Sequence, residues 1–437
     1  MEHVTVIGAG LAGSECAYQL AKRGVPVKLI EMKPGKKSPA HMADTFAELV
    51  CSNSLRSDEL TNAVGLLKEE MRRCGSLIME SADNNRVAAG GALAVDREGF
   101  SRYITEKLIS MPGIETEYRE ATDIPEGEVV IATGPLTSDA MAERITSLCP
   151  GFDLHFYDAV APIVTLESVD MDSAYLASRY GKGTADYVNC PMSREEYDAF
   201  VRELAAAREA PVHGFDDGGV FEGCMPVEVM ARRGIDTLRY GPMKPVGLLN
   251  PHTGGEDYAV AQLRRDNAEG TLYNIVGFQT HLTFGEQRRV FSMIPALRDA
   301  EFVRYGVMHR NTYLDSPRLL DRYYRLKAEP RISFAGQMTG VEGYVESAAS
   351  GMLVGIETAG RMLGLPAVDF PQETATGALA LYVSGGSVGD FQPMNVNFGI
   401  IPPLGRRVRG KRNKNAEISA RALDIIENLK TREVFDL

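Results

Sequence analysis

Residues 3–31 read HVTVIGAGLAGSECAYQLAKRGVPVKLIE, and this stretch decides the fold. An apolar run leads into three glycines, a helical pattern follows, and a second apolar run ends at Glu31. This order is typical of a dinucleotide-binding strand–turn–helix–strand unit. Gly8 permits the tight turn, Gly10 lets a pyrophosphate approach the backbone, and Gly13 allows close packing of helix on strand. The phosphates would then lie on the N–H groups at the helix N-terminus.

Later segments extend this site. Glu31 is placed to accept hydrogen bonds from ribose hydroxyls. The buried strand in EVVIATGP (128–135) ends at Gly134, where backbone can approach a ligand closely. Residues 331–360 again read as strand, glycine-rich turn and helix, with small residues at the helix start. A planar ring could lie against that helix start, and close helix packing is the alternative interpretation. The predicted cofactor-binding residues are Gly8, Ala9, Gly10, Leu11, Ala12, Gly13, Glu31, Gly134, Gly336, Gln337, Ser347 and Gly351.

The nucleotide-binding pattern is divided between the two ends of the chain. That division suits a large cofactor held in extended form, and the spacing from the glycines to Glu31 is the form that FAD proteins favour, so FAD is predicted rather than NAD. The predicted fold class is α/β: a Rossmann-like, glutathione-reductase-like FAD-binding domain with an inserted α/β domain. The expected boundaries are 1–155 for its first part, 156–330 for the insertion and 331–437 for its second part.

Composition limits the remaining possibilities. A chain of 437 residues with 44% apolar and 24% charged residues is that of an ordinary globular protein. No apolar run approaches the ~20 residues of a membrane helix, and the N-terminal strand leaves no room for a secretory signal. The six cysteines lack CxxC or zinc-finger spacing. We therefore expect reduced thiols in a cytoplasmic protein, without a metal site.

A net charge of −12 argues against nucleic acid as a partner. One segment, however, is strongly basic although the chain as a whole is acidic. Residues 402–414 read PPLGRRVRGKRNK and contain no acid. Uncompensated positive charge in an acidic chain favours phosphate contact over a solvated loop. The predicted RNA-binding residues are Arg406, Arg407, Arg409, Lys411 and Arg412, with Lys414 beside them.

Several longer motifs resemble one family. They are VIGAGLAGSECAYQLAKRG, ELVCSNSLRS, NRVAAGGALAVDREGFS, EGCMPVEVMARRG, GPMKPVGL, GFQTHLTFGEQ and GQMTGVEGYVESAASG. Together they resemble the folate- and FAD-dependent tRNA uracil-5 methyltransferases, TrmFO, which are relatives of the GidA-type flavoproteins. The resemblance implies transfer of a one-carbon unit from methylenetetrahydrofolate to uridine 54 in the tRNA T-loop, giving 5-methyluridine. It also implies reduced FAD as the electron source, with NADH or NADPH re-reducing the flavin.

The reaction needs an activated thiol, because C5 of uracil becomes nucleophilic once a thiolate adds to C6. Cys51 follows the first βαβ unit with Arg56 nearby, and Cys224 is close to Arg232 and Arg233. By resemblance, Cys224 corresponds to the thiol that attacks C6. Cys51 corresponds to a cysteine beside the flavin that acts as a general base or guards a reactive one-carbon intermediate, and this division of roles stays open.

Other residues carry weaker indications. His41 and His281 lie in family-like motifs and could contact flavin, folate or RNA, although a structural role is more common for such histidines. Glu342 and Glu346 could bind the folate pterin or cap a helix. The alternative functions are a GidA-type wobble-uridine enzyme and a non-catalytic tRNA-binding flavoprotein. A flavin disulfide reductase would want a redox cysteine pair, and an S-adenosylmethionine methyltransferase has no place for the 331–360 segment.

Overall fold

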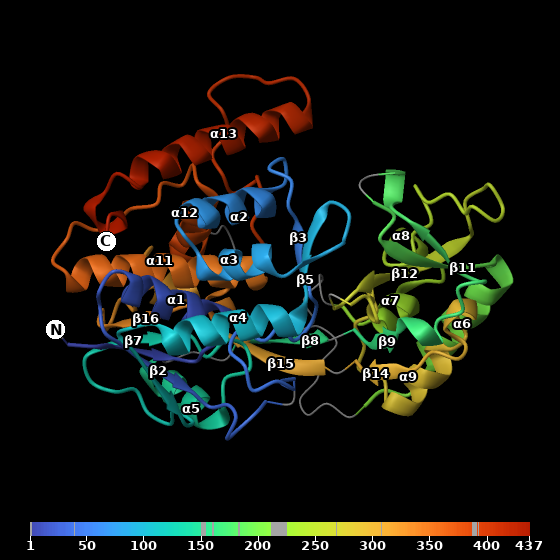
Figure 1. Cartoon of the computed structure of the whole chain (residues 1–437), viewed down its shortest axis with the longest axis horizontal. Helices are drawn as coiled ribbons and strands as arrows, with labels where there is room; N and C mark the ends of the chain where they lie inside the picture. The colour runs from blue at the N-terminus through green and yellow to red at the C-terminus, as the bar shows by residue number, and fades with distance from the viewer. Residues whose placement is uncertain are drawn as a thin grey trace.

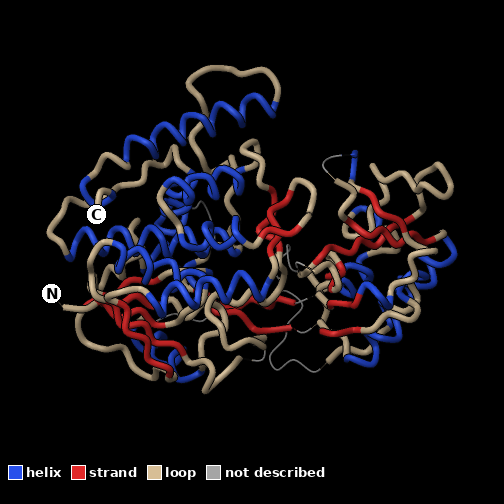
Figure 2. The backbone as a smooth tube through the Cα atoms, viewed as in Figure 1, coloured by secondary structure: helices blue, strands red, loops and turns tan. Residues whose placement is uncertain are grey.

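The computed structural model describes residues 2–38, 40–149, 154–159, 161–181, 184–210, 225–267, 269–306, 308–386, 391 and 393–437. Within them, a five-stranded parallel sheet has the order β16-β7-β1-β2-β6. Its strands are β1 (Val4–Ile7), β2 (Val27–Glu31), β6 (Ile114–Tyr118), β7 (Glu128–Ile131) and β16 (Ile332–Phe334). The predicted Rossmann-like sheet is therefore confirmed (Figures 1 and 2).

Two helices from opposite ends of the chain pack together beside this sheet. The first, α1 (Leu11–Lys22), follows β1 after the glycine turn, and α11 (Tyr344–Met362) follows β16. A Cβ on Gly351 would lie 2.1 Å from the carbonyl oxygen of Ala12, so the two helices approach to backbone contact. In the sheet, β16 runs parallel to β7, with Ile332 opposite Val129. The predicted return of the chain to its first domain is thus confirmed.

Further elements surround this centre. A three-stranded sheet within the described residues has the order β3-β5-β4 and consists of β3 (Ser54–Ser57), β4 (Arg86–Val87) and β5 (Ala92–Val95). The remaining helices of the first domain are α2 (Ala63–Arg73), α3 (Leu77–Asn84), α4 (Arg97–Ser110), α5 (Asp139–Leu148), α10 (Ser316–Leu319), α12 (Ala375–Leu381) and α13 (Lys411–Leu429). Figure 1 shows α13 with a projecting loop before it.

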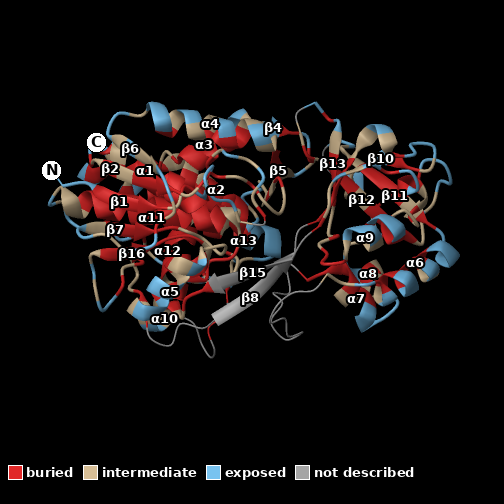
Figure 3. Ribbon diagram, turned by 90° about the horizontal axis from the view of Figure 1, so that it is seen from below, coloured by how far each residue is buried: buried red, intermediate tan, exposed pale blue. Residues whose placement is uncertain are grey.

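The second domain has its own sheet and core (Figure 3). The described strands lie in the order β10 (Tyr175–Ala177), β11 (Tyr187–Met192), β12 (Ala259–Arg265), β13 (Leu272–Ile275), β9 (Ile163–Thr165) and β14 (Phe302–Arg304). Each pairs antiparallel with its neighbour. The accompanying helices are α6 (Arg194–Ala206), α7 (Val227–Arg233), α8 (Thr237–Tyr240) and α9 (Phe284–Phe291). Ser193 and Glu196 form a capping box that fixes the start of α6.

An antiparallel pair, β8 (Leu154–Ala159) with β15 (Met308–Tyr313), connects the two domains. After β15 the chain is already part of the first core, which includes Tyr313, Leu320 and Tyr324. Packing against the first core therefore begins before residue 331, and the boundaries 1–155, 156–330 and 331–437 stay predictions. The predicted boundary at 330 lies just before the next clear strand in the sequence, whereas the described stretch before it contains only short elements such as α10. Among the described residues, no helix is long and apolar enough to cross a membrane.

Candidate functional site

The three glycines of the first turn have different surroundings. Gly8 has φ +96°, and a Cβ there would lie 2.6 Å from the carbonyl oxygen of Ala132. A Cβ on Gly13 would lie 1.8 Å from the carbonyl oxygen of Gly8, so helix and turn are in backbone contact. A Cβ added to Gly10 would have no other atom of its surroundings within 4 Å. Gly10, the N-cap of α1, therefore faces open space where a phosphate group could approach the helix N-terminus.

Glu31 lies at the end of β2 with its carboxylate turned toward this turn. One oxygen accepts a hydrogen bond from the N–H of Ala9 at 2.7 Å, and the other accepts from the N–H of Lys33 at 2.9 Å. Each carboxylate oxygen has a further lone pair, so ribose hydroxyls can still be accepted. The carboxylate is thus fixed in position before any ligand arrives.

Two adjoining cavities form one groove over the carboxyl edge of the parallel sheet. The first lies around Gly8, Glu31 and the end of β7, with about 650 Å³ of space that includes part of the open solvent. The second reaches Gly336 and Ser347, with about 610 Å³ defined in the same way. Both cavities share the lining residues Gly10, His41, Glu48, Ala132, Thr133 and Leu136. Such a long groove fits an extended dinucleotide better than a single nucleotide.

Most of the predicted cofactor-binding residues line this groove. They are Gly8, Ala9, Gly10, Leu11, Ala12, Glu31, Gly134, Gly336, Gln337 and Ser347. Gly13 and Gly351 instead provide the close backbone packing that positions it. Ser350 Oγ accepts from the N–H of Gly336 at 2.7 Å and donates to the carbonyl oxygen of Ser347 at 2.7 Å. The small residues of α11 thus serve both the lining and the packing.

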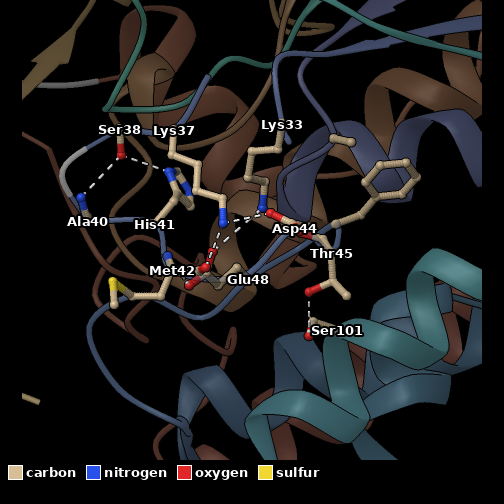
Figure 4. Close-up of polar contacts among 12 residues, drawn as sticks. Lys33, Lys37, Ser38, Ala40, His41, Met42, Asp44, Thr45, Glu48 and Ser101 are labelled. Carbon is tan, nitrogen blue, oxygen red and sulfur yellow. Dashed lines mark hydrogen bonds and ion pairs between the residues drawn. The ribbon is translucent and has the colours of Figure 1, made fainter. Parts of the chain in front are cut away.

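A polar strap, residues 32–38 and 40–50, lines one side of the groove. Figure 4 shows the contacts among its side chains. His41 Nδ1 is 2.7 Å from Ser38 Oγ, and the Nζ of Lys33 lies 3.6 Å from Glu48 Oε2. Burial, together with the positive charge of Lys33, lowers the pKa of His41 below its ordinary value. His41 therefore presents a neutral imidazole to the groove at neutral pH.

Cys51 lies immediately after this strap. The N–H groups of Cys51 and Ser52 donate to Tyr344 Oη at 2.6 and 3.2 Å. Tyr344 opens α11 and lines the second cavity, as does Val50. The half-buried Cys51 is therefore next to the wall of the groove, on the side of Ser347.

The same loop is held by the second domain. Arg264 Nη2 donates to Ser52 Oγ at 2.6 Å, and Asn53 Nδ2 donates to the carbonyl oxygen of Arg265 at 2.8 Å. The guanidinium of Arg97 pairs with the buried carboxylate of Asp266 at 2.9 Å. None of these residues was singled out from the sequence, because only their meeting in three dimensions marks them.

Cys224 lies outside the described residues, in the interval 211–224. On either side of that interval, Glu209 and Glu228 both contact the buried His281. Its Nε2 is 2.9 Å from Glu209 and its Nδ1 is 2.8 Å from Glu228. Burial lowers the pKa of His281, but the two carboxylates raise it more, and the net shift is upward.

The three side chains are close enough to share a metal ion, a grouping that the sequence did not predict. Each ring nitrogen of His281 faces its own carboxylate. That arrangement is typical of an imidazolium with a carboxylate beside each ring nitrogen, and a metal ion would have to displace one of these contacts. The cluster ties the two ends of the interval 211–224 to one side chain.

The other cysteines are buried thiols. Burial raises the pKa of Cys149 to about 11 and the pKa values of Cys74 and Cys190 to about 12, and it also raises the pKa of Cys16. Thiols with such pKa values stay protonated and unreactive at neutral pH.

The two acidic residues of the 331–360 segment are engaged within the protein. Glu346 is fully buried, pairs with Arg56 and accepts from the N–H of Val396 at 3.0 Å. Glu342 accepts from Gln337 Nε2 at 2.9 Å and borders the groove through that partner. Glu346 therefore has a structural role, and Glu342 orients a side chain that lines the second cavity.

The basic segment 402–414 is exposed along the loop and at the start of α13. Arg406 pairs with Glu417 at 2.7 Å. In the described part of the chain no carboxylate forms an ion pair with Arg407, Arg409, Lys411 or Arg412. The positive charge of this segment is thus largely uncompensated, as a phosphate-binding surface requires.

Comparisons with known proteins agree with these features. A family model described as "Glucose inhibited division protein A" matches residues 3–366. A protein of Acetivibrio thermocellus named methylenetetrahydrofolate–tRNA-(uracil-5-)-methyltransferase TrmFO is 59% identical over 428 residues, which cover 98% of each chain. A Lactobacillus delbrueckii subsp. bulgaricus protein of the same name is 57% identical, with both chains covered completely. Among solved structures, Aquifex aeolicus GidA has a TM-score of 0.71 at 15% identity, covering 98% of this chain and 73% of that chain, which shows a shared fold.

Proposed function

The chain belongs to the TrmFO family, within the wider family described as glucose inhibited division protein A, and we propose that it is a folate-dependent tRNA uracil-5 methyltransferase. It transfers the one-carbon unit of methylenetetrahydrofolate to C5 of a uracil in tRNA, and the product is 5-methyluridine. Identity of 57–59% over nearly the whole chain carries this proposal. The groove and its neighbouring thiol supply the chemistry that such a reaction needs.

FAD fits the groove. The open space at Gly10 suits a pyrophosphate, Glu31 suits a ribose, and the backbone at Gly336 and Ser347 suits a flat ring. When bound and reduced, FAD supplies the electron pair that converts a methylene group to a methyl group. NADH or NADPH would restore the reduced flavin.

The thiols perform the carbon chemistry. The thiolate of Cys224 adds to C6 of uracil, forming a C–S bond and an enolate nucleophilic at C5. C5 attacks the methylene carbon of the folate, whose bond to the folate nitrogen breaks. Loss of the C5 proton and cleavage of the remaining bond between the methylene carbon and the folate would then leave an exocyclic methylene on C5 and release the folate. A hydride reduces this methylene to methyl while the C6–S bond breaks and the thiolate leaves.

Cys51 is the candidate for the base that accepts the C5 proton. Its loop is fixed by Tyr344 on the flavin side and by Arg264 on the side of the second domain. That double attachment would hold the thiol at one distance from the groove, which proton transfer over ~3 Å requires. Arg97, which pairs with the buried Asp266, also donates to the carbonyl oxygen of Leu49 just before this loop.

The RNA side of the proposal rests on charge. The segment with Arg407, Arg409, Lys411 and Arg412 would bind tRNA phosphates, and the T-arm with uridine 54 is the proposed target. These contacts position the RNA without reading its bases.

The test is production of 5-methyluridine in a T-arm transcript supplied with FAD, methylenetetrahydrofolate and NADPH. Cys51→Ala and Cys224→Ala should each abolish the product while flavin binding is retained. Cys149→Ala, which removes a buried thiol that does not line the groove, is the matched control and should retain activity. Full activity in both test variants would refute the thiol mechanism. A wild-type protein that binds the transcript but makes no 5-methyluridine would instead favour a non-catalytic tRNA-binding flavoprotein.

A further inference from the structure

Three aromatic rings form a stack at the edge of the second domain. Phe284 lies on Tyr305, with ring centroids 4.8 Å apart and planes 16° apart. Tyr305 lies on Phe302 in turn, at 5.5 Å and 7°. Phe284 is the end ring, and 55% of the residue remains exposed. A large apolar ring held flat at the end of a stack, yet open to solvent, is a ready surface for another flat ring.

The stack is rigidly mounted. Gln287 Nε2 donates to the carbonyl oxygens of Leu282 and Gly306 at 2.7 and 2.8 Å, and its Oε1 accepts from the N–H of Gly306 at 2.8 Å. These bonds tie the start of α9 to the chain that carries Tyr305. Phe284 therefore has few alternative positions, which lowers the entropic cost of stacking a ligand on it.

The stack is next to the loop proposed to carry out the chemistry. Arg304, the residue before Tyr305, donates to the carbonyl oxygen of Ala40 in the strap at 3.3 Å. Burial, and then the nearby guanidinium of Arg97, lower the pKa of Arg304, while Cys51 acts in the opposite direction. The chain that leads into the stack thus contacts the groove strap, and Arg304 is close enough to Cys51 for their charges to interact.

A positive charge accompanies the exposed ring. Arg288 is one helical turn after Phe284, so the two side chains are neighbours on one face of α9. Arg289 pairs with Glu286 and Glu203, whereas Arg288 is exposed and forms no ion pair with any carboxylate of the described residues. An aromatic ring beside an uncompensated cation matches a nucleobase with its phosphate.

We propose that Phe284 is a stacking platform for an unstacked base of the substrate RNA loop, with Arg288 contacting the phosphate beside it. This inference rests on the proposed function, because it requires an RNA whose target uracil leaves its stack to reach the groove. Extrusion of one base removes the stacking partner of its neighbours. The ring of Phe284 replaces that partner at a domain edge that is linked to the strap through Arg304.

The test compares a T-arm hairpin with a duplex of equal length and charge. Phe284→Ala should weaken hairpin binding about 10-fold, within the range for stacking of one base, and should leave duplex binding unchanged. Phe284→Trp should retain hairpin affinity. Leu249→Ala is the matched control, because Leu249 is 69% exposed in the same domain and should change neither affinity. A 2-aminopurine placed in the loop should be quenched by the wild-type protein and less quenched by Phe284→Ala.

Several results would overturn the inference. Equal hairpin affinity of Phe284→Ala and wild type, with a wild type that makes 5-methyluridine, would refute the platform and leave the proposed function intact. A raised KM for methylenetetrahydrofolate with unchanged hairpin affinity would assign the ring to folate instead. A wild type that makes no 5-methyluridine would overturn the proposed function itself. Because Phe284 is exposed, Phe284→Ala should keep the melting temperature of wild type within about 2 °C.

Discussion

Gly10 and Gly13 stand three residues apart in one turn, yet their replacement by alanine should have opposite consequences. At Gly13 a Cβ would lie 1.8 Å from the carbonyl oxygen of Gly8. An ordinary C···O contact is about 3.3 Å, so α1 would have to move roughly 1.5 Å from the turn. Overpacking of this kind costs about 1–3 kcal/mol or more, and the better helix propensity of alanine returns about 1 kcal/mol. We expect Gly13→Ala to lower the free energy of unfolding of the apoprotein by about 2 kcal/mol.

At Gly10 the added methyl group enters open space. The residue has φ −71° and ψ −170°, which alanine adopts without strain. The loss of a glycine N-cap and the reduced entropy of the unfolded chain nearly cancel, so the apoprotein should stay within about 0.5 kcal/mol of wild type. The methyl group would, however, occupy the approach of the pyrophosphate. A clash of about 1–3 kcal/mol corresponds to FAD binding weakened by roughly 5- to 150-fold.

Two measurements separate these effects. Urea unfolding of the flavin-free proteins, followed by circular dichroism, gives the stability, and titration with FAD followed by flavin fluorescence gives the affinity. Gly10→Ala should be stable and bind FAD poorly, whereas Gly13→Ala should be unstable before any FAD is added. Wild-type FAD affinity in Gly10→Ala would refute the assignment of this groove to FAD. Equal stability of Gly13→Ala and wild type would refute the packing argument.

Two other predictions concern charge. Because the pKa of His281 is raised in the folded protein, its stabilising contribution is complete below about pH 6.5 and is lost as the pH rises through the higher folded pKa. His281→Asn should therefore flatten the fall in unfolding free energy above about pH 6.5, and an unchanged slope would contradict the imidazolium assignment. Replacing Arg407 and Arg409 by alanine should reduce the slope of log affinity for tRNA against log salt by roughly 1.5. Arg406→Ala should change the slope less because Glu417 already pairs with Arg406. A slope unchanged by the loss of Arg407 and Arg409 would place the RNA elsewhere.

The features that sequence predicted well are local in the chain. The run from Val4 to Glu31 contains strand, turn, helix and strand within 28 residues, so hydrophobic period and glycine positions specify it completely. The return of the chain at β16 was predictable for the same reason, since its strand and turn repeat the first pattern. Even the packing role of Gly13 followed from spacing alone.

The features that sequence did not predict join distant segments. Tyr344 contacts Cys51 across 293 residues, and Arg264 contacts Ser52 across 212. No hydrophobic periodicity or motif spacing indicates such pairs, because in the sequence each partner taken by itself looks like an ordinary exposed or buried residue. The same holds for His281, whose two carboxylates lie in separate elements. Those contacts arise from tertiary packing, which local patterns do not encode.

The loop with Cys51 is where these distant contacts converge. Tyr344 fixes its backbone from the end of the flavin groove, and Arg264 holds Ser52 from the second domain. Any rotation of the second domain would strain the bond to Ser52 and so displace Cys51 relative to the groove. Arg304 adds a second link, since it joins the strap over the groove to the chain that carries the aromatic stack. The position of the thiol is therefore coupled to the position of the domain proposed to receive the RNA loop, so that substrate docking and thiol placement are set by the same few contacts.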